Sequence, residues 1–136
     1  MRFLKIMLFL CCTPFFVQAQ QLKIKIEGIE KIQGQLRIGI FTEKEEFAGE
    51  NPVIGKVINI SNKIETCVFD DLKEGKYAIS VYQDLNKNGK LDKNFFGIPT
   101  EKYGFSNNPK SRKVPEFKQC SFDFKKEEML IIIKLQ

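Results

Sequence analysis

The chain has 136 residues, a formal net charge of +5, 13 Phe, and neither His nor Trp. With 43% hydrophobic residues, this composition predicts a globular fold rather than a disordered chain. The lack of His excludes Ser-His-Asp triads, Cys-His dyads and His-ligated transition metals. The 22 Lys and Arg residues are interspersed with 17 Asp and Glu and form no basic stripe, so nucleic acid is not an expected partner.

The first 19 residues have the pattern of a secretory signal peptide. A short cationic start precedes an apolar run over residues 6–17, and Val17 and Ala19 stand at the −3 and −1 positions of a cleavage site. The run is too short to span a bilayer, so we expect an exported protein, periplasmic or secreted, that is not membrane-spanning. Two alternatives stay open, a buried first strand or anchor helix and a lipoprotein acylated at Cys11 or Cys12.

Residues 20–136 are predicted to form a single all-β domain. Hydrophobic and polar residues alternate with the period of half-buried strands. The seven expected strands cover residues 22–26, 36–41, 56–60, 64–69, 76–83, 119–124 and 129–135. Seven short strands separated by turn signals favour a seven-stranded antiparallel β-sandwich. A short helical turn is expected over residues 42–47, where Thr42 and Glu45 have the spacing of a capping box.

Cys67 and Cys120 are the cysteines that remain after removal of the signal, and both fall in expected strands. In an oxidising compartment they could form a disulfide, which would stabilise the fold by ~4 kcal/mol for a loop of this length. The alternative is two buried thiols that pack as small apolar residues. Both interpretations stay open, because the sequence does not fix the distance between the Cβ atoms.

Residues 84–115 break the alternation and are rich in Asn, Gly, Pro and Lys, which predicts one long loop. Loops of this length inside a small domain are usually functional. Its aromatic residues have two interpretations. They could anchor the loop onto the sandwich, which is the commoner role, or form an exposed platform that stacks on a ligand. These residues are Phe95, Phe96, Tyr103 and Phe105.

The start of this loop has the spacing of an EF-hand-type calcium loop. Side-chain oxygens occupy positions 1, 3, 5 and 9, and Gly89 occupies position 6, where the chain must turn sharply. The predicted ligands are Asp84, Asn86, Asn88, the backbone carbonyl of Lys90, and Asp92. Position 12 is Phe95 instead of a bidentate carboxylate. The expected cofactor is therefore weakly bound calcium, with a Kd of ~10⁻⁴–10⁻³ M.

Two other interpretations of the same residues stay open. Asn88 and Gly89 could form a plain polar turn stabilised by local side-chain bonds. Alternatively, Asp84 or Asp92 could work with Glu101 as the acid and base of a hydrolase, although no spacing in the sequence demonstrates such a pair.

Three segments resemble a known family. They read Leu72-x-x-Gly75-x-Tyr77-Ala78, Asp84-x-Asn86-x-Asn88-Gly89-Lys90-Leu91-Asp92 and Gly97-x-Pro99-x-Glu101-x-Tyr103-Gly104-Phe105-Ser106-Asn107-Asn108. The chain resembles an uncharacterised family of exported bacterial domains of unknown function. The resemblance implies a prealbumin-like or carboxypeptidase-regulatory-like β-sandwich in the cell envelope or outside the cell, with no established activity. Gln83 stands where the family often has His, which argues against transition-metal ligation.

From these observations we expect an exported, non-enzymatic structural or binding module whose loop is stabilised by calcium. Its partner is unknown, and a cell-envelope glycan or protein is the expected class. The alternatives are a carbohydrate- or peptide-binding module that uses the loop aromatics, and a carboxylate-based hydrolase. The residues expected to brace the loop or to contact a ligand are Glu101, Tyr103, Phe105, Ser106, Asn107 and Asn108.

Overall fold

The computed structural model describes residues 20–125 and 127–136, so the expected signal peptide and the acylation alternative lie outside the described residues. Within the described ranges the chain forms eight strands and one four-residue helix. In chain order these are β1 (Gln21–Glu27), β2 (Gln35–Phe41), β3 (Ile54–Asn59), β4 (Glu65–Asp70), β5 (Gly75–Asp84), β6 (Tyr103–Phe105), α1 (Phe117–Cys120), β7 (Phe122–Phe124) and β8 (Met129–Lys134).

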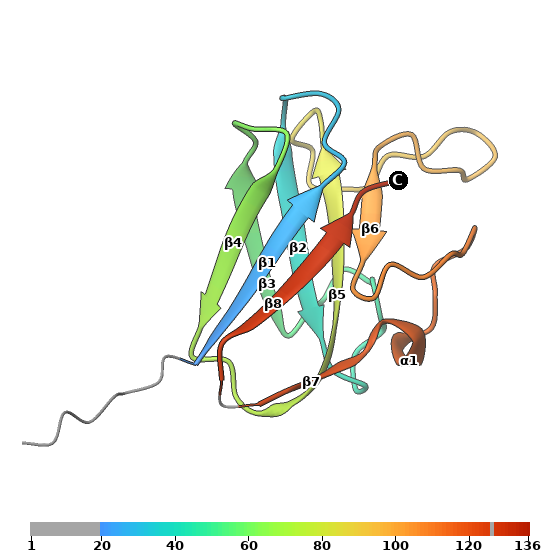
Figure 1. Cartoon of the computed structure of the whole chain (residues 1–136). Coiled ribbons are helices and arrows are strands. Elements are labelled where there is room, and N and C mark those ends of the chain that lie inside the picture. Colours follow the sequence, from blue (N-terminus) through green and yellow to red (C-terminus); the bar gives the residue numbers. More distant parts are fainter. Residues whose placement is uncertain (1–19, 126) are drawn as a thin grey trace, which may run out of the picture.

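The strands form two sheets, which lie as two layers in Figure 1. One sheet has the order β4-β1-β8, and the other has the order β3-β2-β5-β6, with β7 paired to the start of β5. The predicted all-β fold is confirmed. The expected count of seven strands is wrong, because β6 forms inside the segment expected to be one long loop. The expected purely antiparallel pairing is also wrong, because β1 and β8 run parallel to each other.

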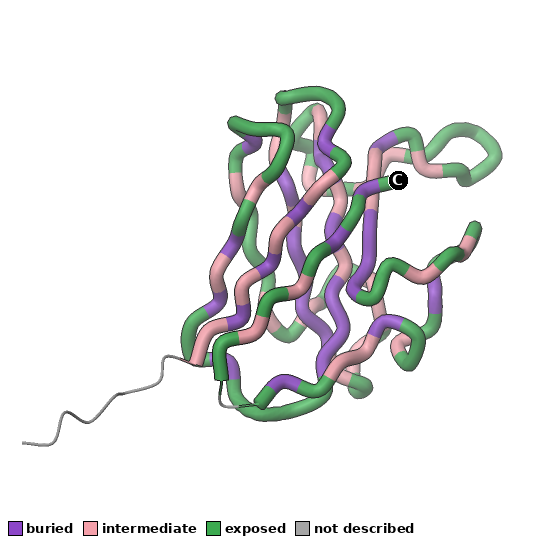
Figure 2. Tube along the Cα trace, in the orientation of Figure 1, coloured by how far each residue is buried: buried purple, intermediate pink, exposed green. Residues whose placement is uncertain are grey.

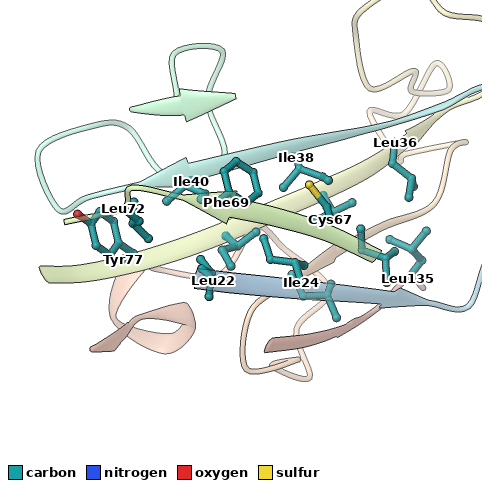
Figure 3. Close-up of a cluster of buried hydrophobic side chains, with 14 of the residues drawn as sticks. Leu22, Ile24, Leu36, Ile38, Ile40, Cys67, Phe69, Leu72, Tyr77 and Leu135 are labelled. Carbon is teal, nitrogen blue, oxygen red and sulfur yellow. The ribbon is translucent and has the colours of Figure 1, made fainter. Parts of the chain in front are cut away.

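The main hydrophobic core fills the space between the two layers. Alternate residues of β1 and β5 face this core, as their sequence pattern predicts, and burial alternates along β1 in Figure 2. Burying each large aliphatic side chain stabilises the fold by roughly 1.5–3 kcal/mol. The side chains drawn in Figure 3 come from both sheets and include Leu22 and Ile24 of β1, Ile38 and Ile40 of β2, and Phe69 of β4.

A second, smaller cluster covers the outer face of the β5 sheet. Ala78, Phe105 and Cys120 are buried there, and Phe47 and Phe117 pack against them. The Phe47 ring lies 5.7 Å from the Phe105 ring and 6.1 Å from the Phe117 ring. The segment after β6 is therefore held against the sheet by aromatic contacts rather than by strand pairing alone.

Two local predictions are wrong. Residues 117–120 form α1 instead of the start of a strand, because a capping box fixes a helical turn there: the Glu116 N–H donates to Gln119 Oε1 (2.9 Å). Residues 42–47 form turns and no helix, although the Glu45 carboxylate does accept bonds from the N–H (2.7 Å) and hydroxyl (2.6 Å) of Thr42. No helix among the described residues is long and apolar enough to cross a membrane.

The candidate disulfide does not form, since Cys67 and Cys120 are both free and buried. Cys67 belongs to the main core and Cys120 to the second cluster, on the opposite face of the β5 sheet. Burial raises the pKa of both thiols, that of Cys120 to about 11. Both side chains therefore stay protonated and pack as small apolar groups, which is the alternative left open by the sequence.

Candidate functional site

The candidate site begins at Asp84, the last residue of β5, whose side chain is fully buried. Its Oδ2 accepts hydrogen bonds from Arg37 Nε (2.7 Å) and from the Gly89 N–H (2.8 Å), and its Oδ1 accepts one from the Asn88 N–H (3.0 Å). Arg37 lies on β2, where the register places it opposite Tyr82 and thus diagonal to Asp84. The buried carboxylate therefore has a cation supplied by the neighbouring strand.

These contacts decide the ionisation of Asp84. Burial acts to raise the pKa of the carboxyl group, but the hydrogen bonds from Arg37, Gly89 and Asn88 outweigh burial, and the net pKa is lowered. Asp84 is therefore a carboxylate at neutral pH. A group of this kind does not supply the proton that a general acid must donate.

The other predicted loop ligands gather around Asp92. Asn86 Nδ2 donates to Asp92 Oδ2 (2.6 Å), and Asn88 Nδ2 donates to Asp92 Oδ1 (2.7 Å). The amide oxygens of the two asparagines turn toward the backbone instead, where Asn86 Oδ1 accepts from the Asn88 N–H (3.2 Å) and Asn88 Oδ1 accepts from the Lys90 N–H (2.9 Å). The structure thus brings the predicted side chains together through nitrogen donors and carboxylate acceptors.

This arrangement does not fit a calcium ion as it stands. Calcium takes oxygen ligands, whereas two amide nitrogens face the Asp92 carboxylate and Arg37 already balances the charge of Asp84. Within residues 20–125 and 127–136, no three His, Cys, Asp or Glu side chains form a group suited to hold a metal. The local bonds and the positive φ of Gly89 (81°) match the polar-turn interpretation. Calcium binding here stays a prediction.

Glu101 braces the loop from its C-terminal end, just before β6, which is one of the roles predicted for it from the sequence. The side chain is buried, and its two carboxylate oxygens accept bonds from two backbone groups of the loop, the Leu85 N–H (2.8 Å) and the Asp92 N–H (2.9 Å). The buried Gln83 side chain ties the same region to the β1–β2 turn by donating to the carbonyls of Lys31 (2.8 Å) and Gln33 (3.0 Å). These polar side chains hold the backbone of the loop in place.

A small hairpin forms the tip of the loop. Lys93 and Pro99 form an isolated bridge, and the Asn94 N–H donates to the carbonyl of Ile98 (2.8 Å). Asn94 Oδ1 accepts bonds from the N–H groups of Phe96 (2.9 Å) and Ile98 (3.0 Å). The turn is therefore fixed by its own hydrogen bonds, and it projects at the upper right of Figure 1.

The two phenylalanines of this tip are exposed. Phe95 is 97% exposed and Phe96 is 82% exposed, and their rings meet edge to face with centroids 5.6 Å apart. The interpretation of these two residues as loop anchors is therefore wrong. We call the exposed residues Phe95, Phe96 and Ile98 the aromatic tip; Ile98 is also more than half exposed.

Tyr103 and Phe105 do serve as anchors. Both lie on β6, their rings are 5.7 Å apart, and both belong to the second cluster, where Phe105 is buried. The anchor interpretation therefore holds for these two aromatics, because β6 pairs with β5 and carries them onto the sheet.

The three residues after β6 act as braces. Ser106 Oγ accepts from the Ile79 N–H (2.8 Å) and donates to the Cys120 carbonyl (2.6 Å), which joins β5 to α1. Asn107 Nδ2 donates to the carbonyls that flank Cys120, those of Gln119 (3.2 Å) and Ser121 (2.9 Å).

The carboxamide of Asn108 reaches the other sheet. It donates to the Ile132 carbonyl (2.8 Å) and accepts from the Lys134 N–H (2.8 Å) of β8. These bonds place Ser106, Asn107 and Asn108 in structural roles, as the sequence interpretation expected.

Neighbouring strands supply two partners of the loop that were not predicted from the sequence. Arg37 faces Asp84, and the Tyr82 hydroxyl donates to the carbonyl of Gly89 (2.9 Å) in the same loop. Both residues face away from the main core, because their neighbours Leu36, Ile38 and Val81 face it. The alternation of β2 and β5 could have shown which face they occupy, but only the pairing of the two strands brings them to Asp84.

A shallow recess of about 100 Å³ lies elsewhere, near the C-terminal end of β8. It is lined by Phe105, Asn108, Pro109, Lys134, Leu135 and Gln136. Asp84, Asp92 and Glu101 take no part in it. The recess therefore does not combine with the loop carboxylates into a catalytic cleft.

Together, the fold and the site define a class of protein: a two-sheet, all-β domain that carries a hydrogen-bonded loop with an exposed aromatic tip. A family model described as "Uncharacterized protein conserved in bacteria (DUF2141)" matches residues 24–131, and the chain belongs to this family. The match spans the whole loop, and it confirms the expected membership of a family of unknown function. Neither the curated proteins nor the solved structures contain a match.

Proposed function

We propose that this domain is an exported, non-enzymatic binding module whose contact surface is the aromatic tip. The observation that carries the proposal is the exposure of Phe95 and Phe96 side by side on a fixed turn. Leaving a Phe side chain in water instead of burying it forgoes roughly 1.5–3 kcal/mol. Contiguous exposed apolar groups mark sites of interaction, so a partner that covers both rings would recover this free energy.

The loop beneath the tip supports a binding role. The carboxylates of Asp84 and Glu101 and the side chain of Asn94 fix the backbone through the hydrogen bonds described above. A binding surface that is ordered before it meets its partner loses less conformational entropy on binding. These bonds therefore order the backbone of the tip before it meets a partner.

The same hydrogen bonds argue against the hydrolase alternative. Both oxygens of Glu101 accept backbone N–H groups, and Asp84 is buried against Arg37. A catalytic acid or base needs a carboxyl oxygen within reach of the substrate proton. These two carboxylates are already engaged in holding the loop.

The edge-to-face packing of the tip argues against a sugar-stacking platform. The planes of Phe95 and Phe96 are inclined by 85°, so the two rings do not share one flat face. Apolar contact with a partner does not need a shared plane. Glycan binding is therefore the weaker of the alternatives that use these aromatics.

Export and fold type are parts of the proposal. The cationic start, apolar run and small residues at positions 17 and 19 support removal of residues 1–19 on export to the periplasm or the outside of the cell. We further propose that the two sheets are a prealbumin-like sandwich, which their shared core supports. Terminal sequencing of the protein from the cell envelope or medium tests export: a chain that begins at Gln20 is expected, and an intact Met1 contradicts it.

The binding role can be tested by photo-crosslinking in cells that produce the protein. A Phe95→p-benzoylphenylalanine variant is expected to give a discrete crosslinked product that the added Phe96→Ser change removes. The matched control is Ile32→p-benzoylphenylalanine, because Ile32 is another exposed apolar residue, on the β1–β2 turn. An equal yield at both positions, or no product at position 95, would contradict a binding role for the tip.

A further inference from the structure

We propose that the partner of the aromatic tip is an anionic phospholipid surface, into whose headgroup region Phe95, Phe96 and Ile98 insert. This inference rests on the proposed function and names its partner class. Three features of the tip carry it: its shape, its surrounding charge and its size.

The shape of the tip suits a deformable partner. The tip is the end of a projecting hairpin, and its apolar side chains lie outside the shallow recess described above. A convex apolar end needs either a complementary pocket or a surface that yields around it. The boundary between lipid headgroups and acyl chains yields in this way to aromatic and aliphatic side chains.

The loop that carries the tip also carries exposed cations. Lys87, Lys90 and Lys93 are exposed on the same loop. The loop acids are less available, because Asp84 and Glu101 are buried and Asp92 accepts bonds from two asparagine amides. Lysine side chains beside an inserted apolar tip can extend their ammonium groups toward lipid phosphates.

A second basic segment extends from the same side of the molecule. Residues 109–114 project at the right of Figure 1, as the tip does, and Figure 2 shows both segments as largely exposed. This segment carries exposed Lys110, Arg112 and Lys113, together with exposed Val114. Two segments with exposed basic residues therefore project on the side that bears the tip, and an anionic surface would attract them.

The charge also argues against a second copy of this chain as the partner. Two copies meeting tip to tip would bring their loop lysines together, and like charges repel at close range. The size of the tip fits a bilayer surface, because the three Cα–Cα steps from Lys93 to Phe96 reach at most roughly 10 Å, the upper end of the ~5–10 Å depth typical of interfacial insertion.

The absence of Trp from the chain allows a direct test. A Phe96→Trp variant carries one indole at the tip, and an Ile32→Trp variant carries one on the β1–β2 turn as the matched control. With mixed phosphatidylglycerol–phosphatidylcholine vesicles, the tip indole is expected to shift its emission to shorter wavelength and to be quenched by brominated acyl chains. The control indole is expected to do neither.

Variants of the tip and its charges complete the test. In vesicle co-sedimentation, Phe95→Ser with Phe96→Ser should weaken binding by about tenfold or more, the equivalent of burying one Phe side chain. Ile32→Ser is the control for lost apolar surface. Lys90→Glu with Lys93→Glu should weaken binding and reduce its sensitivity to salt, whereas Lys63→Glu, at an exposed position on the β3–β4 turn, should change it little.

The outcomes separate this inference from the proposed function. If the tip indole does not respond to anionic vesicles while photo-crosslinking at position 95 yields a protein or glycan, the lipid inference is overturned and the binding module stands. If neither experiment gives a signal at the tip, both are overturned. A shift of the tip indole without vesicles, growing with protein concentration, would identify a second copy as the partner and overturn the lipid inference.

Discussion

At the scale of single residues, the loop depends on one buried carboxylate and the cation that faces it. Asp84 has no exposed surface, whereas the Arg37 side chain is 31% exposed. Water therefore reaches only the Arg37 side of the ion pair. Removing one partner of such a pair leaves a buried charge without compensation, which is more costly than losing an exposed pair. The pair therefore matters for stability as well as for the shape of the loop.

Replacing Arg37 should show this cost. We expect Arg37→Ala to lower the free energy of unfolding by about 2–3 kcal/mol, below the range for fully buried pairs because Arg37 is partly exposed. The measurement is urea unfolding. The control is Lys76→Ala, whose 3.9 Å pair with Asp123 is well exposed and should cost under about 0.5 kcal/mol. Fully additive losses in the Arg37→Ala, Asp84→Ala cycle would contradict the coupling.

Acid should weaken the same interaction. Because the pKa of Asp84 is lowered in the folded protein, the unfolded chain binds a proton more readily. The contribution of Asp84 to stability is therefore present above about pH 4, the ordinary range of an Asp carboxyl, and is lost as the pH falls through the folded value. Melting temperatures measured from neutral pH to about pH 2 should fall less steeply for Asp84→Asn, and parallel curves would contradict this role.

At the scale of elements, the loop between β5 and β6 is held at both ends. β6 pairs with β5, and Gly104 lies so close to β8 that an added Cβ atom would be 2.7 Å from the Lys134 carbonyl oxygen and 2.8 Å from Ile133 Cγ2. The Asn108 carboxamide bonds to β8 just beyond this point. The short strand β6 therefore connects the loop to both sheets.

Gly104→Ala should separate these elements. The contact with backbone atoms cannot relax by a side-chain movement alone. We therefore expect the free energy of unfolding to fall by about 1–3 kcal/mol, as it does in overpacked cores. Gly55→Ala on β3 is the matched control, because an added Cβ would meet only Pro52 Cγ at 3.6 Å. Equal melting temperatures of the two variants would show that the close approach is not a constraint.

Calcium gives a second test of the loop. If the predicted ligands do turn their oxygens to a cation, millimolar calcium should raise the melting temperature of the wild type by a few degrees, and Asp84→Ala and Asp92→Ala should lose the shift. Asp123→Ala, on β7, should retain it. If calcium does not change the melting temperature of the wild type, the calcium prediction is contradicted. The loop is then a polar turn in which Arg37 supplies the positive charge.

Sequence reasoning could predict the central strands because their neighbours enforce a strict alternation. Leu22, Ile24 and Ile26 follow this pattern, and all three are fully buried. It could not predict β6, whose three residues are extended only because β5 pairs with them, or the ion pair of Arg37 with Asp84, which depends on cross-strand register. The sequence left open whether Phe95 and Phe96 anchor the loop or are exposed, because composition does not distinguish an anchoring aromatic from a displayed one.

At the scale of the whole molecule, two sheets share one core and a second cluster covers the outer face of the β5 sheet. Cys67 and Cys120 lie in different clusters, and neither forms a disulfide within the described residues. The described residues are therefore stabilised without a disulfide. A reductant such as dithiothreitol should leave the melting temperature unchanged, and both thiols should react slowly with Ellman's reagent until the protein unfolds. A lower melting temperature in reductant would contradict this arrangement.

The parallel pairing of β1 with β8 has a consequence for the order of events in folding. β1 acquires its second neighbour only when residues 129–134 have left the ribosome. Closing this contact between distant parts of the chain is entropically slow. A nascent chain therefore lacks its complete first sheet until β8 has emerged, and the edge of β1 that β8 covers stays unpaired up to that point.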